Sequence, residues 1–227
     1  MLMIHRNPQR GAVDLGWLQS QHSFSFGSWY NPDYMGVSVL RVINEDRVKP
    51  HTGFGRHGHD NMEILTYVLS GRLTHQDSMG NKGYINAGEW QLMSAGSGVT
   101  HSEMNDADEP VHFLQIWLFP NVKNAEPTYQ QAYVNPFKTP NQWHNIVSPG
   151  ADSPLLIRQD AYVSALVLEA GKHSQTTPKL GTSYIHVIKG QITLNGEPLH
   201  SGDAVALNGP ADISASEDSH LIWFDML

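Results

Sequence analysis

The chain has 227 residues, of which 40% are hydrophobic and 16% are charged, so it can bury the core of one large domain or two small ones. Its 14 basic residues are outnumbered by 22 acidic ones and form no basic run, which argues against direct nucleic-acid binding and against docking on anionic membranes. The absence of cysteine excludes disulfides, thiolate metal ligands and a thiol nucleophile.

Nothing in the sequence directs the chain out of the cytoplasm. The first residues, MLMIHRNPQRG, lack the apolar stretch of a secretory signal. No segment approaches the ~18 apolar residues of a transmembrane helix. We therefore expect a cytoplasmic protein that does not enter the membrane.

Short apolar runs that alternate with turn signals predict strands along the first half of the chain. Residues 36–43, GVSVLRVI, are the first, and the polar NEDR that follows is expected to end this strand. Residues 62–71 and 72–77 come next, and SMGN at 78–81 is expected to form a tight hairpin turn. EWQLMSAG and VHFLQIWLF continue the series. The spacing favours an all-β sandwich or small barrel over a mixed α+β domain, because few windows show helical periodicity.

The composition changes in the middle of the chain, from about residue 120 to residue 145, where polar residues and prolines predict a linker with some local structure. Within it, EPTYQQAYVN at 126–135 could hold a turn of helix. The strand pattern then resumes with PLLIRQ, YVSALVLEAG, SYIHVIKGQITLNG and LIWFDML. The order of strand, glycine, strand, turn and Gly-acidic pair recurs in both halves. We predict two β modules, residues 1–125 and 126–227.

Histidines and carboxylates at alternate positions indicate a metal site. His57, His59 and Glu63 have the same parity, so they share a face if the segment is extended and unbulged. His101 and Glu103 repeat this spacing in GVTHSEMN. If the two segments are neighbouring strands of one barrel, three imidazoles and a carboxylate meet, a set that suits Fe(II), Mn, Co, Ni, Cu(II) or Zn. A single His-X-His pair is a weak signal, and the joint pattern strengthens it.

Aromatic residues are concentrated in HSFSFGSWY, and the sequence favours neither of two interpretations of them. Phe24 and Phe26 could form a wall beside the metal pocket on which a planar substrate stacks. They could equally belong to a core segment between the modules. Met93 could line the same pocket, although packing in the core is favoured for it.

Other chemistries find little support in the sequence. It contains no GxSxG elbow, no GxxxxGK[ST] loop and no HExxH motif. His75 and Asp77 share parity in THQDSMGN, where a turn-stabilising pair is favoured over a proton relay. The second module has no His-X-His pair, so we expect it to be free of metal.

Several motifs together resemble a known family. GFGRHGHDNMEILTYVLSG at 53–71 and GEWQLMSAGSGVTHSEMN at 88–105 look like the two cupin motifs. HSFSFGSWYNPDYMG, LRVINEDRV and LQIWLFP add the order of the pirin family, and the chain looks closest to its bacterial quercetin 2,3-dioxygenase type. The resemblance covers nearly the full length and is strongest over residues 16–120. It implies a bicupin, with two β-sandwich or jelly-roll cupin barrels packed together.

The resemblance also implies a ligand set. His57, His59, His101 and Glu103 would hold one divalent transition metal, Fe(II) in the first place and Cu, Ni, Co, Mn or Zn as alternatives. Glu103 would also be the catalytic residue. Glu63 would support the site by a hydrogen bond to a ligating imidazole. The alternative, in which Glu63 binds the metal and Glu103 does not, stays open.

The function that follows from the resemblance is the opening of a flavonol such as quercetin with O₂ and release of carbon monoxide. The alternative is a metal-binding, redox-sensitive regulatory protein that binds a transcription factor or a metabolic enzyme. Both functions need the same four ligands. A wide pocket mouth flanked by Phe24, Phe26 or Trp29 would favour the enzyme, whereas a capped site under a flat, charged surface would favour the binding protein.

Overall fold

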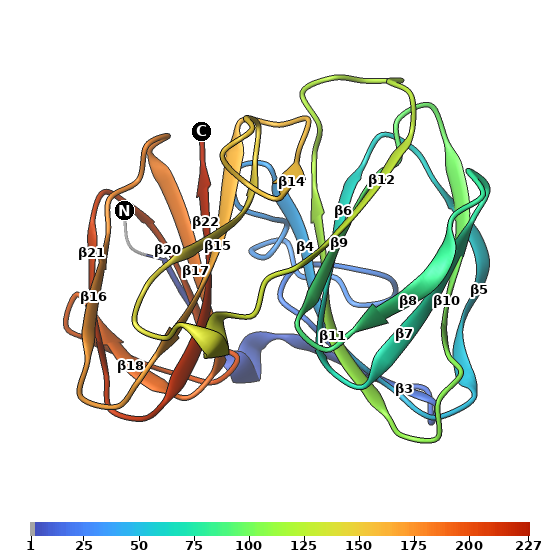
Figure 1. The fold of residues 1–227 in the computed structure, drawn as a ribbon. Coiled ribbons are helices and arrows are strands. Elements are labelled where there is room, and N and C mark those ends of the chain that lie inside the picture. Colours follow the sequence, from blue (N-terminus) through green and yellow to red (C-terminus); the bar gives the residue numbers. More distant parts are fainter. Residues whose placement is uncertain (1–2) are drawn as a thin grey trace. The chain divides into compact units, whose positions relative to one another are not determined.

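The computed structural model describes residues 3–227, and nearly all of their regular structure is β-strand (Figure 1). The predicted all-β class is therefore confirmed. None of the helices in the described part of the chain is long and apolar enough to cross a membrane.

The chain forms two compact units, and each is interrupted in sequence. The N-terminal unit comprises residues 11–134 and 157–159. The C-terminal unit comprises residues 135–156 and 160–227 and also takes in the described residues up to Arg10. Within the described residues, the units thus differ from the predicted modules in residues 3–10, in residues 126–134 and in residues 157–159.

Two antiparallel sheets make up the N-terminal unit, and Figure 1 shows them facing each other. The larger sheet has the order β12-β9-β6-β11-β4-β3-β2, with β2 (Gly11–Asp14), β3 (Leu18–His22), β4 (Leu40–Val48), β6 (Glu63–Ser70), β9 (Glu89–Ser94), β11 (Val111–Leu118) and β12 (Thr128–Tyr133). The smaller sheet has the order β5-β10-β7-β8, with β5 (Thr52–His59), β7 (Arg72–Asp77), β8 (Lys82–Asn86) and β10 (Val99–Asn105). Apolar side chains of both sheets share one buried core: Leu18, Val48, Val68, Leu73, Ile85, Val111 and Phe113.

The C-terminal unit repeats this arrangement. Its larger sheet has the order β1-β20-β17-β22-β15-β13-β14, with β1 (Met3–His5), β13 (His144–Ser148), β14 (Leu155–Leu156), β15 (Ala161–Leu168), β17 (Thr182–Lys189), β20 (Ala204–Asn208) and β22 (Ser219–Met226). Its smaller sheet has the order β16-β21-β18-β19, with β16 (His173–Thr176), β18 (Gln191–Leu194), β19 (Glu197–His200) and β21 (Ala211–Ala215). Two short 3₁₀ helices, η1 (Asn7–Gln9) and η2 (Pro136–Lys138), complete it. The smaller sheets and the four central strands of the larger sheets have matching orders, which supports the internal repeat seen in the sequence. At the edges the units differ, since β13 and β14 pair in parallel whereas β2 and β3 pair antiparallel.

The glycine that follows the first strand of each repeat motif is required by its backbone conformation. Gly71 follows β6 with φ +77°, and Gly190 follows β17 with φ +98°, a region that side-chain-bearing residues rarely adopt. A Cβ at Gly190 would also lie 2.6 Å from the Cα of Ser219. Both turns therefore need glycine.

Gly190→Ala should lower the free energy of unfolding by about 2 kcal/mol, because backbone strain at positive φ adds to the collision with Ser219. Urea unfolding followed by circular dichroism measures this change. Gly83→Ala is the matched control, since a Cβ there meets nothing within 4 Å. Its expected change is within about 0.5 kcal/mol, and equal losses in the two variants would refute the explanation.

Two segments depart from the sequence predictions. Strand β4 begins at Leu40 and runs through the polar NEDR to Val48, so the expected end at residue 43 is wrong. Polar residues continue the strand because both neighbouring strands pair with it: Asn44 lies opposite Gln115 on one side and His22 on the other.

The expected turn of helix at 126–135 is also wrong, because residues 128–133 form β12. This segment pairs antiparallel with β9 along its whole length, from Thr128 opposite Ser94 to Tyr133 opposite Glu89. An unpaired sheet edge offers a ladder of hydrogen bonds that overrides weak local preferences.

Burial of His220 makes the stability of the C-terminal unit depend on pH. The side chain lies on β22 against the ring of Phe137, and desolvation lowers its pKa from 6.5 to about 4. The unfolded chain therefore binds the proton more readily between these values. Stability from this group is complete above pH 6.5 and is lost as the pH falls towards 4, by at most about 3 kcal/mol.

Unfolding of chelator-treated His220→Gln at several pH values tests this dependence. The variant should lose less stability than the wild type between pH 7 and pH 4.5, while His200→Gln, at an exposed position, should follow the wild type. Parallel curves for the wild type and His220→Gln would exclude His220 as the source.

Candidate metal centre

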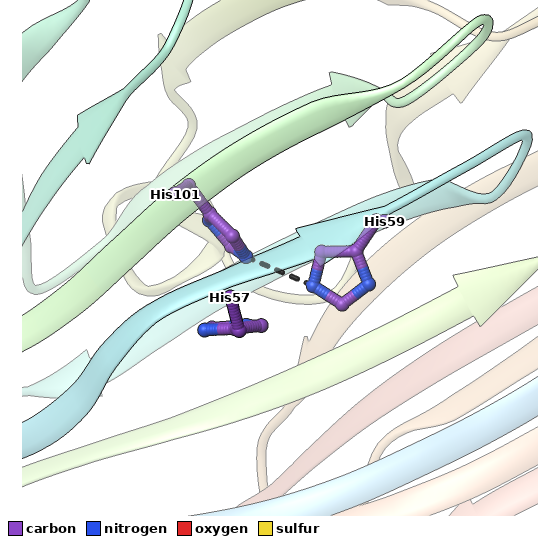
Figure 2. A group of neighbouring side chains, drawn as sticks. All are labelled: His57, His59 and His101. Carbon is purple, nitrogen blue, oxygen red and sulfur yellow. Dashed lines mark hydrogen bonds between the residues drawn. The ribbon is translucent and has the colours of Figure 1, made fainter.

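The metal-site histidines lie on two paired strands of the smaller N-terminal sheet. Strand β10 alternates buried and outward residues, which turns His101 and Glu103 to the inside of the barrel. Strand β5 pairs with it antiparallel, with His57 opposite His101 and His59 opposite Val99. Figure 2 shows the three imidazoles turned towards one another from the two strands. The two segments are thus neighbouring strands, as predicted.

The three imidazoles offer a compact set of nitrogen ligands. One ring nitrogen from each of His57, His59 and His101 lies within 4.8 Å of the others. The Nε2 atoms of His59 and His101 are 3.0 Å apart (Figure 2). His57 Nδ1 lies 2.7 Å from the carbonyl oxygen of Gly55, and because a carbonyl only accepts, Nδ1 carries the proton and Nε2 keeps its lone pair. A metal would replace the proton that His59 Nε2 and His101 Nε2 share, and the three lone pairs would then suit a divalent transition metal.

Burial keeps two of these rings in the ligand-competent state. Desolvation, with the neighbouring His57 adding to it, lowers the pKa of His59 to about 4. Desolvation likewise lowers the pKa of His101 to about 3, again with the other imidazoles adding to it. Both rings are therefore neutral at pH 7, and a neutral imidazole is the form that binds a metal.

Glu103 is buried inside the barrel, does not belong to the group of three convergent histidines, and is hydrogen-bonded to polar side chains of the larger sheet. It is 2% exposed, and its two carboxylate oxygens accept from Gln115 Nε2 at 3.1 and 2.9 Å. Gln115 in turn accepts a hydrogen bond of 2.8 Å from the Thr66 hydroxyl. Burial raises the pKa of Glu103 to about 7. The carboxyl group is thus fixed in position and can take up or release a proton near neutral pH.

A bulge separates the ligand segment of β5 from the rest of the strand. The pairing shifts after His101, so that Glu103 lies opposite Phe54. The extra residue on β5 reverses the parity, and Phe54 therefore packs against the core from the same face as the histidines. The assumption of an unbulged segment holds only for residues 57–59.

Glu63 does not share a strand with the histidines. Strand β5 ends at His59, the chain turns through Asn61 with φ +58°, and Glu63 begins β6 in the other sheet. Because the chain leaves the strand at this turn, alternation in the sequence no longer tells on which face Glu63 lies. The Glu63 carboxylate accepts from the Ser94 hydroxyl at 2.8 Å and from the Arg158 backbone N–H at 3.3 Å. Its bond to a ligating imidazole stays a prediction.

His75 and Asp77 form the turn-stabilising pair that the sequence favoured. His75 Nε2 lies 2.9 Å from an Asp77 oxygen, with both side chains buried. Asp77 also accepts from the backbone N–H groups of Met79 at 2.9 Å and Asn81 at 3.0 Å. The carboxylate thereby closes the turn between β7 and β8. The pair also lies close to the histidine cluster, since the His75 and His101 rings are 5.4 Å apart.

The predicted aromatic wall is only partly the one observed. Phe24 is 1% exposed and Met93 is fully buried in an apolar cluster, whereas Phe26 lines a surface pocket. The sequence did not indicate Trp117, yet its ring packs edge-on against that of His59, with the two ring centroids 4.9 Å apart. The signal was its alternation with Gln115 on β11, which places both side chains on the inner face.

Known proteins are similar to this chain in sequence. The Pirin family model matches residues 4–118, and the model of the quercetinase C-terminal cupin domain matches residues 145–226. Quercetin 2,3-dioxygenase of Escherichia coli strain K12 is 40% identical over 233 aligned residues, which cover 100% of this chain and 99% of that protein. A pirin-like protein of Caulobacter vibrioides is 39% identical, over 98% of this chain and 99% of its own.

The solved structures agree with these relatives. The crystal structure of the bacterial pirin YhhW from Escherichia coli, in complex with nickel(II), matches with a TM-score of 0.94 and 38% identity. The match covers 100% of this chain and 99% of that chain. With a pirin model over half the chain, a quercetinase cupin model over most of the rest and a full-length structural match, this chain belongs to the pirin family and has its bicupin fold.

Proposed function

We propose that this protein is a metal-dependent dioxygenase of the quercetin 2,3-dioxygenase type, which opens a flavonol ring with O₂ and releases carbon monoxide. The observation that carries the proposal is the cluster of three convergent imidazoles on β5 and β10. Full-length identity of 40% to a quercetin 2,3-dioxygenase supports the same reaction here.

His57, His59 and His101 would hold the metal, and Glu103 would complete the set as ligand or as base. Fe(II) is the ion we propose first, and the nickel(II) complex of the related pirin supports a divalent transition metal. When bound, the metal would act as a Lewis acid on a substrate hydroxyl and supply redox chemistry towards O₂.

Glu103 has the properties of a general base for this reaction. With a pKa of about 7, Glu103 can accept a proton from the substrate hydroxyl at neutral pH. The two hydrogen bonds from Gln115 hold the carboxylate in one orientation, so little reorganisation precedes the transfer. Burial of Glu103 and His101 keeps water away from both groups.

A surface pocket lined by Phe26 and Trp29 supports the enzyme over the regulatory alternative, because Trp117, which also lines this pocket, packs against His59. Of the three aromatic residues expected to flank the pocket of an enzyme, Phe26 and Trp29 line this pocket and Phe24 does not. A planar aromatic molecule is the ligand that such a lining accepts best.

The test is aerobic quercetin consumption with detection of carbon monoxide. Chelator-stripped protein would be reloaded in parallel with Fe(II), Mn, Co, Ni, Cu and Zn. We expect turnover with at least one redox-active metal. Stoichiometric metal binding without turnover in any sample would refute quercetin cleavage and direct the search to protein partners.

A further inference from the structure

An aromatic pocket of about 390 Å³ opens on the surface of the N-terminal unit. This volume is within the range of pockets that hold small organic ligands. The Trp117 ring lies between the pocket and the metal centre, because its centroid is 4.9 Å from that of His59 and 5.3 Å from that of Phe26. Most of the lining is aromatic or methionine: Phe26, Trp29, Tyr30, Met35, Met62, Trp117 and Phe119.

Three of the lining side chains are unusually exposed for their type. Tyr30 is 71% exposed, Phe119 is 47% exposed and Met35 is 43% exposed. Single exposed apolar residues are common, but several around one hollow mark a surface that binds something. The flat rings and the methionine suit a planar aromatic ligand better than an aliphatic chain.

Two polar groups specify that ligand further. The indole Nε1–H of Trp117 is buried and has no acceptor, although a buried indole N–H usually finds one. Arg41 brings a positive charge to the lining, and its guanidinium is held in place by a 2.8 Å hydrogen bond to the Ser25 carbonyl. A ligand with an oxygen acceptor and negative charge would satisfy both groups.

We propose that this pocket binds the remote ring of a planar, oxygenated aromatic substrate whose reacting end lies at the metal centre. Trp117 Nε1 donates a hydrogen bond to a substrate oxygen, and Arg41 selects substrates that carry negative charge, such as ionised phenols. The reaction at the metal centre rests on the proposed function, whereas binding of the aromatic ring in the pocket does not.

Calorimetric titration of metal-free protein tests binding apart from chemistry. The probes are quercetin, which carries ionisable hydroxyls, and unsubstituted flavone, which carries none. Tyr30→Ala and Phe119→Ala should each raise the Kd for both probes about two- to tenfold, because each removes an aromatic contact. Both side chains are exposed, so truncation should leave folding intact.

The polar groups predict a different pattern. Trp117→Phe and Arg41→Gln should weaken quercetin binding several-fold more than flavone binding, because the ring wall stays while a donor or a charge is lost. Tyr133→Ala is the matched control, since Tyr133 is 52% exposed on β12 and does not line the pocket. It should bind both probes like the wild type.

Binding and turnover fail in distinguishable ways. Weaker probe binding in the pocket variants, in a protein that turns over no flavonol, would sustain the pocket and refute only the proposed reaction. Kd values equal to those of the wild type and of Tyr133→Ala in all four pocket variants would overturn the pocket, even where quercetin is cleaved. In an active enzyme, the KM for quercetin should rise with Kd while kcat and metal content change little.

Discussion

Replacement of His101 by alanine is expected to abolish metal binding and turnover together. His101 is the buried member of the cluster, and its Nε2 lies 3.0 Å from that of His59. Without it, the two remaining imidazoles come from one strand. Metal affinity should then fall on the order of 100-fold or more, which exceeds the loss expected when a residue that only supports a ligand is removed. Metal content after dialysis, measured by atomic spectroscopy, and quercetin turnover give the two readouts.

His51→Ala is the matched control for this variant. His51 precedes β5, and its exposed side chain lies 3.1 Å from an Asp108 carboxylate oxygen. It does not belong to the three-histidine cluster. It should keep its metal and its activity. Circular dichroism of both variants excludes a folding defect. A His101→Ala protein that retained stoichiometric metal would contradict the site.

Glu103→Gln is expected to lower turnover by roughly 10²- to 10⁴-fold while most of the metal stays bound, because the amide cannot accept the substrate proton. The change keeps the side-chain volume. Gln115 Nε2 can still donate to the single amide oxygen of the new side chain, so one of its two hydrogen bonds survives. Metal content and kcat measured on the same preparation separate a base from a ligand. Equal loss of metal and turnover would make Glu103 a ligand alone.

Glu63→Gln is the informative comparison, because Glu63 is also a buried carboxylate of the N-terminal unit. Its oxygens accept from Ser94 and the Arg158 backbone, so the variant should keep metal and most activity. If Glu63→Gln lost the metal and Glu103→Gln kept both metal and turnover, the two carboxylates would exchange roles. This pair of variants therefore decides the alternative that parity in the sequence left open.

Local pattern was sufficient for the fold class and for most strands. Apolar runs ended by glycine located β6 and β17, because the turns after them require a positive φ. The sequence could not reveal that β1 pairs with β20, about 200 residues later, or that residues 128–133 extend a sheet edge. Such pairings depend on which edge is left open in the folded chain, and no window of neighbouring residues carries that information.

The site was predictable where ligands share a strand and less so where they do not. Alternation placed His57 with His59, and His101 with Glu103, and the structure joins the three histidines. Alternation along a strand could not place Glu63 or Trp117 relative to the histidines. A three-residue turn separates Glu63 from β5, and Trp117 reaches the site from the opposite sheet.

The fate of molecular oxygen tests the central claim most directly. Metal-loaded protein would turn over quercetin under ¹⁸O₂, and mass spectrometry would follow the ring-opened product and the carbon monoxide. A dioxygenase puts both atoms of O₂ into the product, so we predict two ¹⁸O atoms there and none in the carbon monoxide. A product that takes its oxygen from water, or the absence of any ring-opened product, would contradict the account.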